Sequence, residues 1–366
     1  MKTIQRADFD RLFEVLREKG YKIVGPTVRD EAIVYDEIES TSDLPEGFGD
    51  EQEAGHYRLR KRDDKALFGY VVGPHSWKKY MFPPKLKLWE ADKAGRSYEI
   101  KTPEDPAQKY AFIGVRACEL KAIQIQDKVF NNGMFADSYY NKIRKNILVI
   151  AANCTEAGGT CFCVSMNSGP RATFGYDLSL TEITNKDEHY FVVTEGSSKG
   201  KELTSALTCE ETSEADNKRA GEAIKNAEIN MGRQMDTKGL REVLFANLES
   251  PRWSEIASRC LTCANCTLVC PTCFCSNVED TTDLTGDHTE RWRRWDSCFT
   301  MEYSKVAGGN FRTSPKARYR QWMTHKLSSW HDQFGTSGCV GCGRCITWCP
   351  VGIDITKEAE LIRKNQ

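Results

Sequence analysis

Eight of the sixteen cysteines fall into two runs with the same spacing, C-x2-C-x2-C-x3-C-P, at residues 260–271 and 339–350. In this spacing three close thiolates hold one [4Fe–4S] cube, and the fourth cysteine crosses to the other cube. Two residues between ligands let a tight loop curl around a corner of the cube, and the proline turns the fourth cysteine away. The predicted ligands are Cys260, Cys263, Cys266 and Cys349 for one cluster, and Cys339, Cys342, Cys345 and Cys270 for the other.

Zinc is the main alternative to iron and sulfide at these two runs. A zinc site takes four thiolates as two separated C-x2-C pairs, which leaves no role for eight cysteines in two identical runs. Ordinary burial of cysteine does not impose a repeated spacing either. The runs therefore indicate two [4Fe–4S] clusters of the bacterial ferredoxin type, and a zinc-stabilised interaction module is kept as an alternative of another class.

Four further cysteines indicate a third metal site. Residues 111–115 and 146–152 are short apolar runs, and residues 119–129 between them have helical spacing. This order predicts a right-handed βαβ unit whose carboxyl edge carries Cys118 and Cys154. A glycine-rich loop then completes a quartet that suffices for a third [4Fe–4S] cluster or, second in preference, a zinc ion; the alternative is that the strand-end thiols are ordinary core residues. The quartet is Cys118, Cys154, Cys161 and Cys163.

The remaining cysteines have weaker patterns. Cys273 and Cys275 directly follow the first run, and Cys298 follows a segment in which arginine and tryptophan are interleaved. These three thiols are either a further partial metal site or side chains packed near the clusters, and the second interpretation is preferred because no fourth ligand is evident. Cys209 lies alone in a polar stretch and is assigned no role.

The composition divides the chain into three parts and predicts an α+β fold. Residues 1–205 are expected to form an α/β domain that contains the parallel βαβ unit and the third metal site. Residues 206–240 are polar and helix-forming, which is typical of a connector. Residues 241–366 are expected to form an α-helical ferredoxin-like domain, in which the two cluster loops hang between helices.

Local patterns add expectations for single elements. Apolar residues at helical spacing predict a helix over residues 9–16. Residues 40–58 are rich in charge and glycine without periodicity, which is typical of a loop. Between the two cysteine runs, residues 291–306 and 317–327 show helical patterns, and the whole C-terminal part is expected to be poor in strands.

Composition and motifs also exclude several classes of function. The chain has 366 residues with 51 basic and 52 acidic side chains, so its net charge of -1 gives no electrostatic reason to expect nucleic acid or a membrane surface as a partner. It contains neither an apolar run of membrane-spanning length nor the apolar core of a signal peptide, which predicts a cytoplasmic protein with reduced cysteines. No G-x-G-x-x-G or Walker sequence is present, and the six histidines are scattered, so no catalytic residue is predicted and a nicotinamide site is expected on another subunit.

Over most of its length the chain resembles the iron–sulfur beta subunit of cytoplasmic [NiFe]-hydrogenases of the sulfhydrogenase type, a family related to the iron–sulfur A subunit of anaerobic sulfite reductase. The stretches that carry the resemblance are Gly114-Val115-Arg116-Ala117-Cys118, Cys154 with Cys161-Phe162-Cys163, Gly175-Tyr176-Asp177-Leu178, both cysteine runs, and residues 270–275, 294–298 and 306–312.

The resemblance implies a role in electron transfer. A beta subunit of this type relays electrons between a flavoprotein subunit with FAD, which exchanges with NAD(H) or NADP(H), and the large and small subunits of a [NiFe]-hydrogenase. It also favours the third cluster, because members of the family look similar at all four positions of the Cys118 quartet. The alternative within the resemblance is the A subunit of a sulfite reductase, which uses the same clusters to deliver electrons to a sirohaem subunit.

Overall fold

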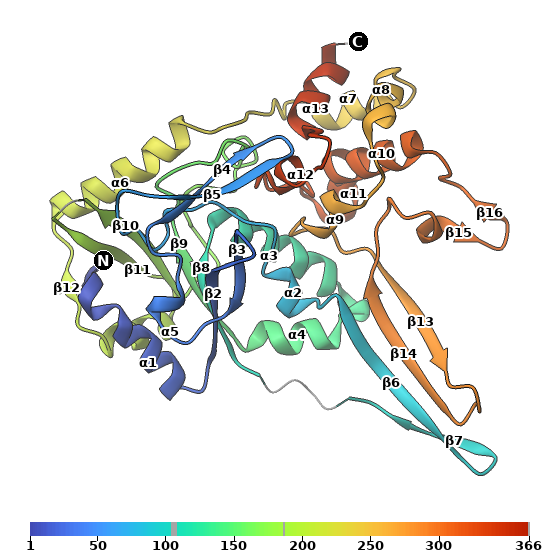
Figure 1. Ribbon diagram of the computed structural model, residues 1–366, viewed down its shortest axis with the longest axis horizontal. Helices are drawn as coiled ribbons and strands as arrows, with labels where there is room; N and C mark the ends of the chain where they lie inside the picture. The colour runs from blue at the N-terminus through green and yellow to red at the C-terminus, as the bar shows by residue number, and fades with distance from the viewer. Residues whose placement is uncertain (104–107, 186, 365–366) are drawn as a thin grey trace.

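The protein has a mixed α/β architecture built on one large sheet. The computed structural model describes residues 1–103, 108–185 and 187–364. An eight-stranded sheet forms the body, a four-stranded antiparallel sheet projects from it, and most of the C-terminal helices gather at one end (Figure 1). Two two-stranded hairpins complete the strands of the described residues.

The eight-stranded sheet contains the predicted βαβ unit. Strands β8 (Tyr110–Val115) and β9 (Ile147–Ala152) are parallel neighbours, and the connection between them contains helix α3 (Ala117–Phe130), so this strand–helix–strand unit is confirmed. Strands β2 (Lys22–Arg29) and β10 (Leu178–Thr184) extend the parallel part on either side, and the remaining pairings are antiparallel. The strand order is β12 (Glu210–Glu211), β1 (Lys2–Gln5), β11 (His189–Glu195), β10 (Leu178–Thr184), β9 (Ile147–Ala152), β8 (Tyr110–Val115), β2 (Lys22–Arg29) and β3 (Ala32–Glu37).

Helices cover both faces of this sheet. The predicted N-terminal helix is α1 (Asp10–Glu18), and Phe9 at its start stacks on Phe191 of β11 with ring centroids 4.3 Å apart. Tyr190 and Val192 of β11 point to the opposite face of the sheet, where they pack against helix α6 (Glu214–Ile229). Helix α3 packs on the same side of the sheet as α6, against side chains of β8 and β9. Because both faces of the sheet are covered, the sequences of the parallel strands are continuous runs of apolar residues.

The expectation of a loop over residues 40–58 is wrong. This segment contains a 3-10 turn (Thr41–Asp43) and a hairpin of β4 (Phe48–Glu53) and β5 (His56–Lys61). Most of its side chains are polar, so no apolar periodicity reveals the strands. Gly55 turns the hairpin with a φ of +73°, and a Cβ there would lie 2.9 Å from the carbonyl oxygen of Cys349. The hairpin tip therefore rests directly on the second cysteine run.

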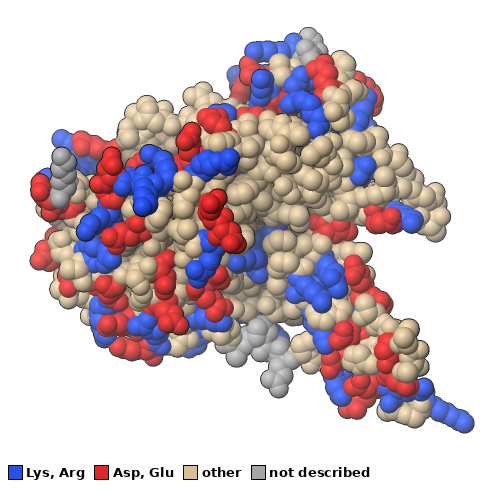
Figure 2. Space-filling model, viewed as in Figure 1, with Lys and Arg blue, Asp and Glu red and all other residues tan. Residues whose placement is uncertain are grey.

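The helix expected over residues 291–306 is also wrong. Strand β14 (His288–Trp295) pairs with β13 (Ser276–Thr282) on one side and with β6 (Lys85–Ala94) on the other, and β6 pairs with β7 (Ser97–Lys101). Interleaved arginine and tryptophan suit a strand that is partly buried on both faces, because a strand alternates its side chains between faces. We call these four strands the arm; it projects from the body (Figure 1), and side chains of both charges cover the side shown in Figure 2.

The arm combines strands from residues 85–101 and 276–295, a pairing that the sequence did not suggest. The expectation that the C-terminal part is poor in strands is therefore wrong.

The predicted helix over residues 317–327 is confirmed as α10 together with a π-helical turn, η5. The domain boundaries at residues 205 and 240 stay a prediction. The C-terminal helices are α7 (Leu240–Ala246), α8 (Arg252–Arg259), α9 (Asn265–Leu268), α10 (Pro315–Thr324), η5 (His325–Ser329), α11 (Trp330–Phe334), α12 (Arg344–Thr347) and α13 (Ile355–Lys364).

The packing of Phe9 gives a test of the body. Phe9 is 0% exposed, whereas Phe135 is 82% exposed. Phe9→Ala should lower the free energy of unfolding by about 3–5 kcal/mol, because it leaves a cavity between α1 and the sheet. Phe135→Ala is the matched control and should leave the urea midpoint of anoxic unfolding, followed by circular dichroism, nearly unchanged. Equal midpoints for the two variants would contradict this packing.

Candidate metal centres

The first cysteine run and the end of the second run enclose one set of thiols. Helix α8 ends at Arg259, and Thr262 and Ala264 adopt left-handed φ angles of 53° and 67°, which curl the loop around a hollow. The four thiols of the predicted first cluster line this hollow together with Cys345, and their binding of one cluster stays a prediction. We call this the first thiol set, and it consists of Cys260, Cys263, Cys266 and Cys349.

Backbone amides point at the sulfurs of this first set. The amide of Thr262 donates to Cys260 Sγ over 3.4 Å, and that of Ile353 donates to Cys349 Sγ over 3.3 Å. Aromatic and aliphatic side chains close the hollow around the thiols, among them Phe299 and Trp322. Amide donors and an apolar wall are the features that stabilise a thiolate-bound cube and set its potential.

The remaining cysteines of the two runs form the second thiol set. It is curled by Gly341 and Gly343, whose φ angles are +65° and +75°. A Cβ at Gly341 would lie 2.6 Å from the backbone of Phe162, so the loop needs glycine to approach this neighbour. The amide of Gly341 donates to Cys339 Sγ over 3.4 Å. The set is defined as Cys339, Cys342, Cys345 and Cys270. The end of the first run lies beside the start of the second, because the Thr272 hydroxyl donates to the carbonyl oxygen of Gly338 over 2.6 Å. That these four thiols bind one cluster stays a prediction.

The predicted quartet forms a third thiol set next to the second. Cys118 begins helix α3, and Cys154 follows β9, so both leave the same sheet edge. Cys161 and Cys163 come from the glycine-rich loop, and the Cys163 thiol interacts with those of Cys161 and Cys154. The third thiol set is Cys118, Cys154, Cys161 and Cys163.

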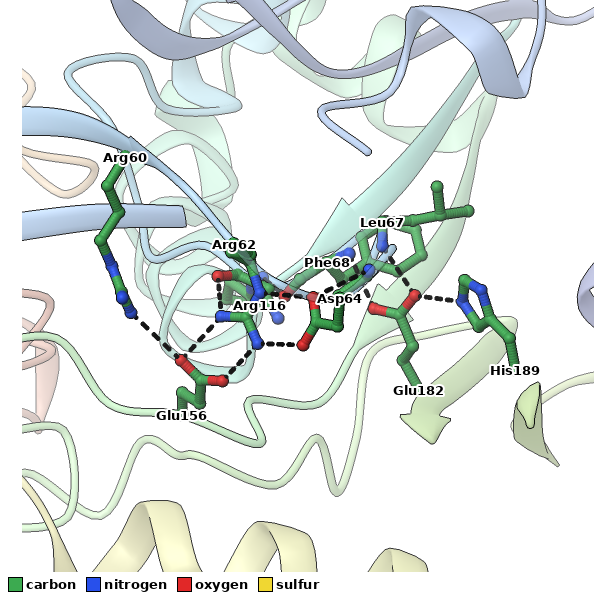
Figure 3. A network of polar contacts seen from close by, with 11 residues as sticks. Arg60, Arg62, Asp64, Leu67, Phe68, Arg116, Glu156, Glu182 and His189 are labelled. Atoms are coloured by element: carbon green, nitrogen blue, oxygen red, sulfur yellow. Dashed lines mark hydrogen bonds and ion pairs between the residues drawn. The ribbon is translucent and has the colours of Figure 1, made fainter. Parts of the chain in front are cut away.

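Polar contacts hold the loop between Cys154 and Cys161 in place. Glu156 of this loop accepts hydrogen bonds from both terminal nitrogens of Arg62, over 2.9 and 2.6 Å (Figure 3). Arg62 also binds Asp64 over 2.7 Å. Arg116, just before Cys118, donates to the carbonyl oxygens of Phe68 and Tyr70 over 2.8 and 2.7 Å. Residues 62–70 are therefore bonded both to the loop that follows Cys154 and to Arg116, which precedes Cys118.

A buried ion pair connects the second and third sets. Arg344 lies between two cysteines of the second set, and its Nη2 is 2.5 Å from Oε1 of Glu119, the residue after Cys118. Both side chains are buried, and Arg344 also donates to the carbonyl oxygen of Gly73 over 2.9 Å. Neither residue was predicted, because a glutamate in a helical stretch and an arginine in a cluster loop carry no sequence signal of burial.

The spacing of the thiols bears on the choice of metal. Among the described residues, one group of three possible metal ligands has all its ligand atoms within 4.8 Å of one another, and it consists of Glu90, His288 and Glu290 on the arm. No three sulfurs of a thiol set lie that close together in the described part of the chain. A tetrahedral zinc ion with Zn–S bonds of about 2.3 Å would bring its sulfurs to about 3.8 Å from each other. The thiol sets are more open than that, and a four-iron cube suits the wider spacing.

Burial dominates the protonation of most of these thiols. It raises the pKa of Cys339 and of Cys161 to about 12, and it raises that of Cys345 well above its ordinary value. Cys270 differs, because a hydrogen bond from Cys273 and the nearby ammonium of Lys326 lower its pKa. Metal binding at the raised thiols must therefore release protons, which couples metal affinity to pH.

The other three candidate cysteines also come together, at the base of the arm. We call Cys273, Cys275 and Cys298 the basal cysteines. The Cys275 thiol interacts with that of Cys298, and the Cys273 thiol interacts with those of Cys275 and Cys270. Cys209, in contrast, lies apart and donates to the carbonyl oxygen of Thr204 over 3.6 Å.

A buried lysine next to the second set was not predicted. Lys326 is 2% exposed, and its Nζ lies 3.4 Å from Cys270 Sγ and 3.5 Å from Cys273 Sγ. A signal for it exists in the sequence. The apolar face of the 317–327 helix repeats at Trp322, Met323 and Leu327, and Lys326 falls on that face, where a charged side chain is unexpected.

Comparisons with known proteins agree with this geometry. A family model described as a 4Fe-4S dicluster domain matches residues 259–353. The chain is 31% identical over 291 residues to the protein named sulfhydrogenase 2 subunit beta of Pyrococcus furiosus, an alignment that covers 79% of this chain and 83% of that protein.

No solved structure matches the chain. Of the helices in the described ranges, none is long and apolar enough to span a membrane. The dicluster domain lies over the first and second thiol sets and supports [4Fe–4S] clusters there. The length and identity of the match confirm the resemblance on which the sequence analysis relied. The chain belongs to the family of iron–sulfur beta subunits of sulfhydrogenases.

Proposed function

We propose that this chain relays electrons between a flavoprotein subunit, which exchanges with NAD(H) or NADP(H), and the large and small subunits of a [NiFe]-hydrogenase. The dicluster domain and the family support the electron-transfer role itself. The observation that carries the proposal is that the three thiol sets lie in series. Each set would hold one [4Fe–4S] cluster, with the ligands that the sequence predicts.

The contacts between sets support this series. Cys345 of the second set lines the same cavity as the four cysteines of the first set. On the other side, Cys342 of the second set packs in one buried cluster with Cys118, Cys161 and Cys163 of the third set. The second set is therefore the middle member, flanked by the other two.

The surroundings of the sets suit single-electron transfer. When bound, a cube changes its charge by one electron with little rearrangement, and amide hydrogen bonds and solvent exposure set its potential. The chain's part is to hold the thiols, aim amides at the sulfurs and exclude water. Cys342 and Cys270 of the middle set are buried, whereas Cys263 of the first set is exposed. A partner can thus approach the relay at the first set.

Purification under anoxic conditions tests the choice of partners. A tagged chain should copurify with a large subunit that contains nickel and with a flavoprotein that contains FAD. Metal analysis and the absorption spectrum of the isolated complex identify these partners. A complex with sirohaem and without nickel would instead show that the chain is the A subunit of a sulfite reductase. A preparation with zinc and without iron would favour the interaction module.

Replacing Cys345 tests the second set. Cys345→Ala should lower the iron content by about four per chain, destabilise the C-terminal helices and stop electron transfer to the hydrogenase, because metal binding is coupled to folding. Iron and sulfide analysis together with hydrogen-dependent NAD(P) reduction by the complex provides the measurement. Cys209→Ser is the control and should retain both. Unchanged iron and activity in Cys345→Ala would contradict the assignment.

Replacing Cys161 tests the third set separately. Cys161→Ser should lower the iron content by about four per chain and leave the EPR signals of the other clusters after dithionite reduction. The matched control is again Cys209→Ser, which removes a thiol of similar size away from every set. If the iron content and the EPR spectrum of Cys161→Ser equal those of the wild type, the quartet holds no cluster.

A further inference from the structure

The base of the arm brings together three thiols that the proposed relay does not use. Cys273 and Cys275 directly precede β13, and Cys298 follows β14. The two strands pair from Ser276 opposite Trp295, and the amide of Asp296 donates to the carbonyl oxygen of Cys275 over 2.9 Å. The hairpin therefore places cysteines from both of its ends side by side, although they are far apart in the sequence.

The local packing turns these thiols toward one another. Phe274 lies between Cys273 and Cys275 in the sequence, and its ring packs against Trp330 with centroids 5.4 Å apart. In an extended segment alternate side chains point to opposite sides, so the anchored ring leaves both thiols on the other side. There the Cys275 thiol interacts with the Cys298 thiol and with the hydroxyl of Tyr303.

Two buried lysines provide an independent observation. The Nζ of Lys326 donates to Cys273 Sγ over 3.5 Å, and the Nζ of Lys78 donates to the carbonyl oxygen of Cys273 over 3.1 Å. Lys78 is 3% exposed and also lies 3.9 Å from the ring centroid of Trp295. Within the described ranges, no carboxylate forms an ion pair with either lysine, although many surface lysines have one.

The surroundings of the basal cysteines are electropositive. Lys326 Nζ also has Cys270 Sγ at 3.4 Å, the Thr272 hydroxyl at 3.2 Å and the Gly338 carbonyl oxygen at 3.1 Å as partners. Both ammonium groups nevertheless lie directly beside Cys273. Positive charge next to a thiol favours its thiolate form, and metal binding likewise replaces the thiol proton.

We propose that Cys273, Cys275 and Cys298 hold a fourth [4Fe–4S] cluster, whose fourth iron has no cysteine ligand from this chain. The proposal extends the electron-transfer function and rests on it for the assignment of Cys270 to the second set. The hydroxyl of Tyr303 lies beside Cys275 and is an oxygen ligand that this chain would offer to the open position. The Cys298 thiol also interacts with Cys266 of the first set, so the fourth cluster would lie beside both clusters of the dicluster domain.

Iron counting on the full-length, anoxically purified protein tests the proposal. The wild type should contain about sixteen irons per chain, Cys298→Ser about twelve, and the control Cys209→Ser about sixteen. Mössbauer spectroscopy counts the clusters directly. A cube with one non-cysteine site loses that iron readily, so mild oxidation with ferricyanide should produce the EPR signal of a [3Fe–4S] cluster in the wild type and in Cys209→Ser, but not in Cys298→Ser.

The outcomes separate this proposal from the proposed function. A wild type with about twelve irons, no [3Fe–4S] signal and an unchanged iron content in Cys298→Ser would overturn the fourth cluster and leave the three-cluster relay intact. A disulfide between Cys275 and Cys298, found by mass spectrometry of the anoxic protein, would overturn it too. A wild type without iron would overturn both proposals. If Cys298→Ser does not fold, the iron count and the oxidation of the wild type decide the question.

Discussion

A buried ion pair between Glu119 and Arg344 holds the two halves of the molecule in register. Glu119 follows the first cysteine of the third set, and Arg344 lies inside the cluster loop of the second set. Because breaking a buried ion pair exposes an uncompensated charge to an apolar interior, the pair resists any sliding of one loop past the other. The geometry of the second and third thiol sets thus depends on an ion pair whose two residues are not themselves cysteine ligands.

The same balance of charge explains the other buried cations. Thiolate-bound cubes carry net negative charge, and the interior around the sets supplies Arg116, Arg344, Lys78 and Lys326. Surrounding thiolates outweigh the effect of burial and raise the pKa of Lys326, whereas burial prevails at Lys78 and lowers its pKa to about 8. Positive charge near a cube favours its reduced form, so these side chains would raise the potentials of clusters bound in the proposed relay.

The sequence predicts two kinds of feature well. One is a loop whose ligands are neighbours along the chain, and the other is a strand that is buried along its whole length. The repeated spacing predicts the cluster loops because the ligands of one corner are neighbours along the chain. Two apolar runs predict the βαβ unit, which places Cys118 and Cys154 at the same edge of the sheet. The arm was missed, because neither face of its hairpin is fully buried and its strands therefore have no apolar periodicity. Without the arm, Cys275 and Cys298 have no visible reason to meet, and their joint role stays hidden.

Burial also differs along the series of thiol sets in a way that suits a relay. Cys118, Cys161 and Cys163 of the third set are buried, as are Cys342 and Cys270 of the second, whereas Cys263 of the first set is exposed. Burial keeps water away from the enclosed sets. This limits both side reactions with solvent and fluctuations of charge near a one-electron carrier. The exposed set can come close to the cofactor of another subunit. In the proposed relay, the fold would thus shield the middle of the path and leave one end accessible to a partner subunit.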